Sequence, residues 1–256
     1  MEILIITEAG RDTGLGHLIR CISLYQAFEE KGLESRLIVN GDGIAEGLLK
    51  GKRYELFDWL TERDRLFSLL RESGMAVIDS YLADITLYKE VSKFVETPVY
   101  IDDNNRLDYP RGIILNTNIY AEEIAYPENK DKTYFCSSRY VLLRKEFRNV
   151  ADKKIKDKMD TVMLTFGSND TRGLTLAVLK FLKDKYTELR KNVVVGTGFQ
   201  NMEEIKGLND RNINLIYNPD AKEMKKIMLE SDIAISAAGQ TLYELARVGL
   251  PTIGIC

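Results

Sequence analysis

The sequence predicts an α/β protein built from two Rossmann-like domains. Short, β-branched apolar segments alternate along the chain with segments of helical periodicity, which is typical of parallel sheets covered by helices. This alternation occurs twice, before and after a highly charged segment at 145–160 that contains few large apolar residues. We therefore expect two domains, 1–150 and 151–256, that face a cleft.

The first half contains the longer series of elements. Apolar runs predict strands at 2–7, 35–40, 54–57, 75–79, 98–103, 113–116 and 140–143. Helical spacing predicts helices at 18–28, ended by Gly32, and at 44–49. Thr61 and Asp64 have the spacing of a capping box for a further helix that runs through Leu70.

The second half repeats the pattern. Strands are predicted at 161–166, 192–195, 213–216, 232–236 and 251–256. Helices are predicted at 174–186 and 221–229, and a third begins after Thr241 and is ended by Gly249.

Composition excludes several classes of function. The formal net charge of −3 with 29% charged residues provides no basic field, so nucleic acid is not an expected partner. The apolar runs have the length of strands, so we expect no membrane insertion. Cys21, Cys136 and Cys256 lack metal or redox spacing and the chain has one histidine, so we expect no metal site and a cytoplasmic protein. Nothing in the sequence indicates the oligomeric state.

The single histidine, His17, lies between the first expected strand and the first expected helix. Gly10, Gly14 and Gly16 let the backbone turn sharply there and approach a ligand closely. The amide groups and positive dipole at the helix start favour an anion, and the dipole is expected to lower the pKa of His17. A neutral His17 is then a candidate general base, and the alternative is a histidine that only caps or packs. The turn lacks the complete dinucleotide fingerprint, so we expect no nicotinamide or flavin cofactor.

Acidic residues follow two further strands of the first half. Asp79, Tyr81, Asp102 and Asp103 come at or just after strand ends, and parallel strands bring these ends to one edge of the sheet, beside His17. Each acid alone is explained by capping a helix or turn. The set as a whole favours a site.

Two glycine turns in the second half suit a nucleotide. The segments at 167–170 (GSND) and 237–241 (AAGQT) each precede a helix, whose amide groups favour phosphate. Glu244 lies one helical turn after Thr241, where a carboxylate can accept hydrogen bonds from both ribose hydroxyls. The alternative is an ordinary surface glutamate.

Several of these motifs together resemble a known family. They lie at 14–21 (GLGHLIRC), 77–81 (VIDSY), 101–103 (IDD), 114–121 (ILNTNIYA), 139–147 (RYVLLRKEF), 166–170 (FGSND) and 236–245 (SAAGQTLYEL). The chain resembles the PseG-like UDP-2,4-diacetamido-2,4,6-trideoxy-β-L-altropyranose hydrolases of pseudaminic acid biosynthesis. It also resembles the wider SpsG family of spore-coat polysaccharide biosynthesis proteins, which are related to MurG-like glycosyltransferases of the GT-B superfamily.

The resemblance implies a role for particular residues. His17 is implied as the catalytic residue. The sugar-binding residues that it implies in the first domain are Gly14, Gly16, Asp79, Tyr81, Asn118, Tyr140 and Arg144. The UDP-binding residues that it implies in the second domain are Gly167, Ser168, Gly239, Gln240, Thr241 and Glu244.

The implied reaction is attack of water on the anomeric carbon, with inversion and release of UDP, and it needs no metal or other cofactor. Members of the family continue beyond the position of Cys256, so we expect the second domain to be truncated. An inverting glycosyltransferase is the alternative enzyme, and a nucleotide-sugar-binding protein without turnover is the alternative outside catalysis.

Overall fold

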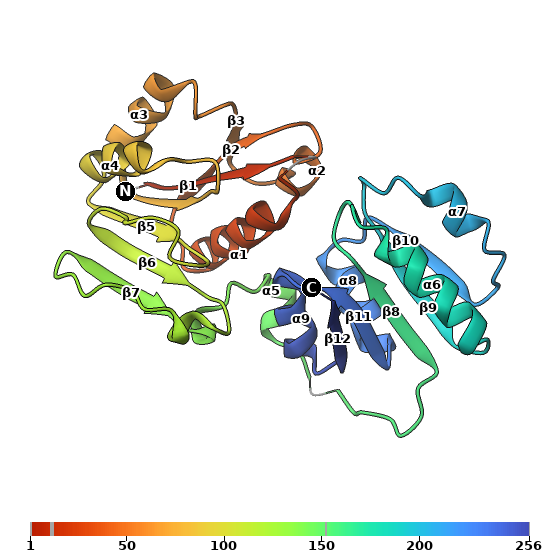
Figure 1. The fold of residues 1–256 in the computed structure, drawn as a ribbon. Coiled ribbons are helices and arrows are strands. Elements are labelled where there is room, and N and C mark those ends of the chain that lie inside the picture. The colour runs from red at the N-terminus through yellow and green to blue at the C-terminus, as the bar shows by residue number, and fades with distance from the viewer. Residues whose placement is uncertain (1, 11–12, 152, 256) are drawn as a thin grey trace. The chain divides into compact units, whose positions relative to one another are not determined.

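Two parallel β-sheets, each in its own unit of the chain, form the framework of the protein (Figure 1). The computed structural model describes residues 2–10, 13–151 and 153–255. The units are Met1–Arg144 and Lys145–Cys256. The arrangement confirms the predicted fold class, because each unit is a Rossmann-like α/β sheet.

The first sheet has the strand order β3-β2-β1-β4-β5-β6-β7, with every pair parallel. Its strands are β1 (Glu2–Ala9), β2 (Ser35–Gly41), β3 (Tyr54–Leu56), β4 (Ser73–Asp79), β5 (Thr97–Ile101), β6 (Gly112–Asn116) and β7 (Lys132–Cys136). The helices are α1 (Gly16–Glu30), α2 (Glu46–Leu49), α3 (Arg63–Arg71) and α4 (Ile85–Phe94), with short 3₁₀ helices η1 (Ala121–Glu123) and η2 (Ser138–Tyr140). Strands β2 and β3 are added in turn on one side of β1, and β5, β6 and β7 are added in turn on the far side of β4. The strand order therefore reverses between the neighbours β1 and β4.

Both faces of the first sheet are covered, which explains its almost uninterrupted apolar strands. Leu4 and Ile6 of β1 pack in a core with α3 and α4. Ile3 and Ile5, which point to the opposite face, pack in a second core with α1. Figure 1 shows α1 on one side of the sheet and α3 with α4 on the other.

The second sheet has the order β10-β9-β8-β11-β12 and is also parallel. Its strands are β8 (Thr161–Thr165), β9 (Arg190–Val195), β10 (Ile213–Tyr217), β11 (Ile233–Ala237) and β12 (Thr252–Ile255). The helices are α5 (Lys145–Arg148), α6 (Leu174–Lys185), α7 (Met202–Lys206), α8 (Ala221–Glu230) and α9 (Gln240–Val248). Here the strand order reverses between β8 and β11.

The second unit begins before the expected boundary at residue 150. Phe147 of α5 is fully buried, and α5 packs against α8 and α9. Arg247 of α9 donates hydrogen bonds to the carbonyls of Arg148 and Val150. The start of the charged segment is therefore part of the second unit, although its composition is that of a connector.

The predicted strand at 140–143 is wrong. The last strand of the first sheet is β7, and residues 141–144 have no regular structure. Leu142 instead packs against the core on the α1 side of the sheet. An apolar run can fill a core from a loop, and periodicity alone does not distinguish this case from a short strand.

The capping box at Thr61 and Asp64 is also wrong. Helix α3 begins at Arg63, and the carboxylate of Asp58 accepts hydrogen bonds from the Leu60 amide and the Thr61 hydroxyl. A complete capping box is present at α8, between Asp220 and Glu223. Helices α4, α5 and α7 and strand β7 were not predicted.

Among the described residues, every helix is too short or too polar to cross a membrane. Cys21 and Cys136 are free thiols, and Cys256 lies outside the described part of the chain.

A buried ion pair supports the amino-terminal edge of the second sheet. Lys191 of β9 is fully buried, and its Nζ donates to the Leu189 carbonyl and to Asp210 Oδ2, both at 2.9 Å. Burial acts to raise the pKa of Asp210, but the hydrogen bonds from Lys191 and the Asn212 amide and the positive charge of Lys191 together outweigh it, so the pKa is lowered. The Asp210 carboxylate therefore stays ionised beside Lys191.

We predict that Asp210→Ala will lower the free energy of unfolding by about 3 kcal/mol, because it leaves the Lys191 ammonium group buried without its counterion. Urea denaturation of the whole chain measures the change. The control is Glu203→Ala, which removes an exposed pair with Lys206 and should change stability by less than about 1 kcal/mol. Equal effects of the two substitutions would contradict the assignment.

Candidate active site

The topology of the first sheet brings His17 and Asp79 together. His17 is the second residue of α1, which follows β1, and Asp79 is the last residue of β4. Thr7 of β1 is paired with Asp79 in the parallel register. Crevices in open α/β sheets form at the carboxyl ends of strands where the strand order reverses, which is the position of this pair.

His17 and Asp79 form a short hydrogen bond. His17 Nδ1 lies 2.7 Å from Asp79 Oδ1, and the Asp79 side chain is only 1% exposed. Because an ionised carboxylate only accepts, Nδ1 carries the proton and the Nε2 of the neutral ring keeps its lone pair. This is the arrangement of a histidine that acts as a general base.

Arg20 lies one helical turn after His17 and holds two carboxylates. Its Nε and one Nη donate to the two oxygens of Asp79 at 2.5 and 2.6 Å. Both Nη atoms donate to Asp103, at 2.7 and 3.0 Å. Such forked pairing is specific to the planar guanidinium group. Sequence reasoning quoted Arg20 within the GLGHLIRC motif but assigned it no role; its spacing of three residues from His17 was the available signal.

The charges around His17 raise its pKa, whereas the sequence analysis predicted a lowered pKa. Burial lowers the pKa of His17, but the hydrogen bond and charge of Asp79 outweigh it, so the pKa lies above 6.5. The prediction of a lowered pKa is therefore wrong. A full negative charge at 2.7 Å outweighs a helix dipole, which is equivalent to about half a positive charge.

The two acids remain ionised. Burial acts to raise the pKa of Asp79, but Arg20 and His17 lower it by more. Burial also raises the pKa of Asp103, whereas hydrogen bonds from Arg20, Tyr81 and Asn118 bring it down to about 2.

Asp103 connects this cluster to two loops. It accepts a hydrogen bond from the Tyr81 hydroxyl at 2.5 Å and from Asn118 Nδ2 at 2.9 Å. The half-exposed Tyr81 ring also meets the His17 ring edge-on, with centroids 4.7 Å apart. The structure thus unites His17, Asp79, Tyr81, Asp103 and Asn118, all of which the sequence analysis named, with Arg20, to which it assigned no role.

Glu8 is a further acid at this edge. It is buried at the end of β1 and accepts hydrogen bonds from the Tyr81 amide, at 2.8 Å, and from the Ser80 hydroxyl. It therefore holds the loop that carries Tyr81. Sequence reasoning did not single it out.

Asp102 does not join the cluster. Its carboxylate accepts hydrogen bonds from the Asn105 and Arg106 amides and from the hydroxyls of Tyr109 and Tyr126. It anchors the loop after β5, which is the capping interpretation considered for each acid alone.

The remaining predicted residues of the first unit lie in the glycine turn at the start of α1 and in the segment after β7. Gly14 adopts φ +72°, which favours glycine, and exchanges backbone hydrogen bonds with Gly10, whereas Gly16 is the first residue of α1. Tyr140 is exposed in η2 and contacts the Phe135 ring, and Arg144 is the last residue of the unit.

The two glycine turns of the second unit also meet where strand order reverses. Residues 167–170 follow β8, residues 237–241 follow β11, and the two strands are neighbours. Gly167 has φ +81°, whereas Gly239 directly precedes α9, which begins with Gln240 and Thr241. Such a pair of turns offers amide groups to an anion.

The structure gives further detail on two of the predicted residues of the second unit. Glu244 is 1% exposed, so its interpretation as an ordinary surface glutamate is wrong. Ser168 lies against the end of β9, where a Cβ on Gly196 would overlap the Ser168 carbonyl. The Ser168 carbonyl also accepts a hydrogen bond from the Gly198 amide at 3.0 Å.

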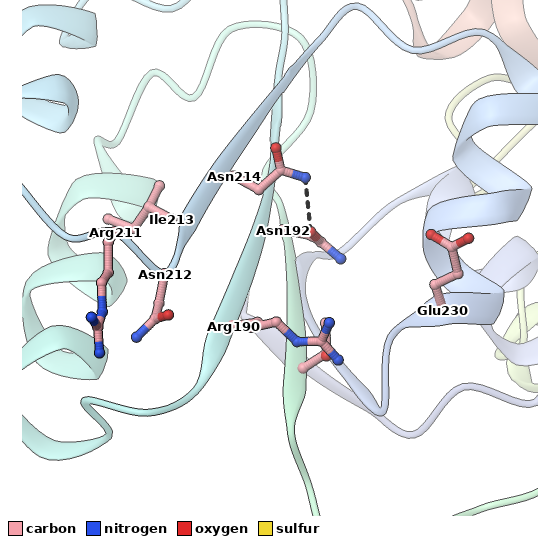
Figure 2. Close-up of a pocket in the computed structure, with 8 residues that line it drawn as sticks. Arg190, Asn192, Arg211, Asn212, Ile213, Asn214 and Glu230 are labelled. Atoms are coloured by element: carbon pink, nitrogen blue, oxygen red, sulfur yellow. Dashed lines mark hydrogen bonds between the residues drawn. The ribbon is translucent and has the colours of Figure 1, made fainter.

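A hollow of about 510 Å³ lies at the other edge of the second sheet (Figure 2). Thr161 and Arg190, which begin β8 and β9, line it together with Asn192, Asn214 and Glu230 among others. Asn214 Nδ2 donates to Asn192 Oδ1 at 3.1 Å across the hollow's wall. This hollow is thus at the amino-terminal edge, remote from the glycine turns of the same sheet.

The described His, Cys, Asp and Glu side chains form no group of three or more that is suited to a metal ion.

Comparisons with known proteins relate the chain to enzymes of glycan synthesis. Residues 161–256 match the glycosyltransferase family 28 C-terminal domain. The chain is 24% identical over 268 residues to the uncharacterized protein MJ1062 of Methanocaldococcus jannaschii, covering 99% of this chain and 55% of the relative. It is 24% identical over 267 residues to the Helicobacter pylori pseudaminic acid cytidylyltransferase and UDP-2,4-diacetamido-2,4,6-trideoxy-beta-L-altropyranose hydrolase, covering 99% and 44%. Against the Bacillus subtilis spore coat polysaccharide biosynthesis protein SpsG the identity is 21%, with 99% and 76% covered.

The chain spans about half the length of the first two of these relatives. Among solved structures, it is similar to MurG from Acinetobacter baumannii, with a TM-score of 0.60, 15% identity and 100% and 78% of the two chains covered. It is also similar to SnogD from Streptomyces nogalater, with a TM-score of 0.61, 15% identity and 99% and 82% covered. Both of these structures have the GT-B fold. The similarity covers both units of this chain.

We predict that Gly196→Ala will displace the Ser168 turn, because the added methyl group overlaps its backbone. The substitution should lower the free energy of unfolding by about 1–3 kcal/mol. If this turn binds UDP, as the family resemblance implies, the UDP affinity measured by calorimetry should fall as well. The control is Gly47→Ala, since a Cβ on Gly47 of α2 meets no atom within 4 Å. Unchanged UDP affinity in a folded Gly196→Ala variant would show that this turn does not bind the nucleotide.

Proposed function

We propose that this chain hydrolyses a nucleotide-activated sugar and releases the nucleoside diphosphate and the free sugar. The observation that carries the proposal is His17, held by a buried, ionised Asp79 at the edge where the strand order reverses. A base in this position can activate water without a metal ion.

For the substrate, we propose a UDP-activated diacetamido-trideoxy sugar of pseudaminic acid or surface polysaccharide biosynthesis. Support comes from the hydrolase activity named for the Helicobacter pylori relative, at 24% identity, and from the polysaccharide biosynthesis named for the Bacillus subtilis relative, at 21% identity.

In the proposed reaction, Nε2 of neutral His17 takes a proton from water as the water oxygen bonds to the anomeric carbon. The bond from that carbon to the phosphate oxygen breaks on the opposite face, so the configuration inverts and UDP leaves with the oxygen. Asp79 stabilises the imidazolium ion that forms. The turns with Gly167, Ser168 and Gly239 are the proposed diphosphate cradle.

The roles of the remaining residues follow the resemblance, with one change. We propose that Gly14, Gly16, Tyr81, Asn118, Tyr140 and Arg144 bind the sugar, and that Gln240, Thr241 and Glu244 bind the nucleotide. Asp79 was expected to bind the sugar, but its oxygens already accept hydrogen bonds from His17 and Arg20. We therefore assign it to His17.

An inverting glycosyltransferase is the second candidate, because residues 161–256 match a glycosyltransferase domain. The same base would then take its proton from a hydroxyl of the acceptor. Release of sugar without any acceptor distinguishes the hydrolase from the transferase.

We predict that His17→Ala will lower kcat by about 100- to 10,000-fold, because the base is removed, while UDP affinity stays nearly unchanged. The assay is proton NMR of the chain with UDP-2,4-diacetamido-2,4,6-trideoxy-β-L-altropyranose and no acceptor. Wild-type protein should release sugar of inverted anomeric configuration. An intact substrate would point to another sugar or to a transferase, and full activity of a folded His17→Ala variant would exclude His17 as the base.

We predict that kcat/KM will rise with pH through the pKa of His17, because only the neutral ring accepts a proton. Since that pKa is raised, the midpoint should lie above 6.5. Asp79→Asn removes the negative charge that raises the pKa, so the midpoint should move to lower pH and the plateau should fall. Rates measured across the pH range test both statements, and a midpoint unaffected by Asp79→Asn would contradict them.

A further inference from the structure

Arg20 is the one cation of the cluster among the residues that the structure describes, and it lies between Asp79 and Asp103. We propose that Arg20 is a positioning residue: it fixes the Asp79 carboxylate against His17, opposes its charge, and links both to Tyr81 and Asn118 through Asp103. The catalytic part of this inference rests on the proposed function, whereas its electrostatic part does not.

The first argument is geometric. Arg20 is buried, and its Nε and Nη donate to both oxygens of Asp79 at 2.5 and 2.6 Å, which fixes the plane of the carboxylate. In that plane Asp79 Oδ1 faces His17 Nδ1 at 2.7 Å. A carboxylate held at only one oxygen can rotate about its terminal torsion, which is broad. Arg20 therefore determines the direction in which His17 points.

The second argument is the balance of charge. In the described part of the chain, the charged and titratable groups around His17 are Asp79 from β4, Arg20 from α1, Glu8 from β1, and Tyr81 with its partner Asp103 from the loops. The charges of Asp79 and Glu8 raise the pKa of His17, and that of Arg20 lowers it. Arg20 thus limits the rise that Asp79 produces, so that more of the base stays neutral at a given pH.

The third argument concerns the loops. Asp103 accepts two hydrogen bonds from Arg20 and one each from Tyr81 and Asn118. These three partners lie on α1, in the loop after β4 and in the loop after β6. One guanidinium group therefore orients both the base and two side chains proposed to contact the sugar.

The chain offers a matched control for a purely structural ion pair. Arg36 of β2 also bridges two carboxylates, those of Glu2 and Glu55, at 3.0 and 2.8 Å. It belongs to the same sheet, but its partners are in β1 and β3 and do not include His17. Arg36→Gln therefore removes the same charge and a similar pair of contacts without touching the cluster.

The test uses His17 itself. It is the only histidine of the chain, so the imidazole proton signals in an NMR pH titration belong to one residue. We expect the pKa of His17 to rise in Arg20→Gln, to fall in Asp79→Asn, and to stay unchanged in Arg36→Gln. The opposite signs of the first two shifts are the signature of charge balance, which a general loss of stability does not produce.

An unchanged or lower pKa in folded Arg20→Gln, or an equal shift in Arg36→Gln, would overturn the electrostatic role. The NMR titration needs no substrate. It therefore tests the electrostatic role of Arg20 even if the chain does not hydrolyse the proposed sugar.

The positioning role has its own readout. Arg20→Lys keeps the charge but loses the forked pairing, so the pKa of His17 should stay close to that of the wild type while kcat falls by up to about 100-fold, because the base is misplaced. Circular dichroism checks that both Arg20 variants fold. If Arg20→Gln does not fold, kcat of Arg20→Lys still tests the positioning role. A wild-type kcat in Arg20→Lys would show that the fork does not position the base.

Discussion

The guanidinium group of Arg20, held between Asp79 and Asp103, is the interaction on which the candidate site depends. Burying one of these charges alone would be costly, whereas four hydrogen bonds among the three groups compensate for the lost water. The same contacts tie α1 to the ends of β4 and β5. Removing any one member therefore affects the position of His17 as well as stability.

Both sheets present their candidate functional segments at equivalent positions. In the first, α1 with His17 meets the end of β4, and in the second the turns after β8 and β11 meet. Parallel strands that diverge from a common centre leave space at their carboxyl ends, which accounts for the equivalence. The first edge carries acid–base groups and the second carries glycine turns, which matches a proposed division between sugar chemistry and nucleotide binding.

Most of the fold was predictable because buried parallel strands have a strong local signature. The run EILIIT is apolar at consecutive positions because Ile3 and Ile5 pack on one face and Leu4 and Ile6 on the other. The errors arose where the local signal was ambiguous. Leu142 fills the core from a loop instead of a strand, and β7 alternates exposed with partly buried residues at an edge of the sheet.

The sequence by itself determined the alternation of strands and helices, the two glycine turns and the acids at strand ends, because these follow from residues close together in the chain. It also singled out His17, Asp79 and Tyr81. Only the tertiary structure decided that Arg20 joins Asp79 and Asp103, 59 and 83 positions away, and that Asp102 turns to its own loop. The raised pKa of His17 likewise depends on Asp79. Charge pairing acts over a few ångströms in space, and no local pattern encodes which distant residues come that close.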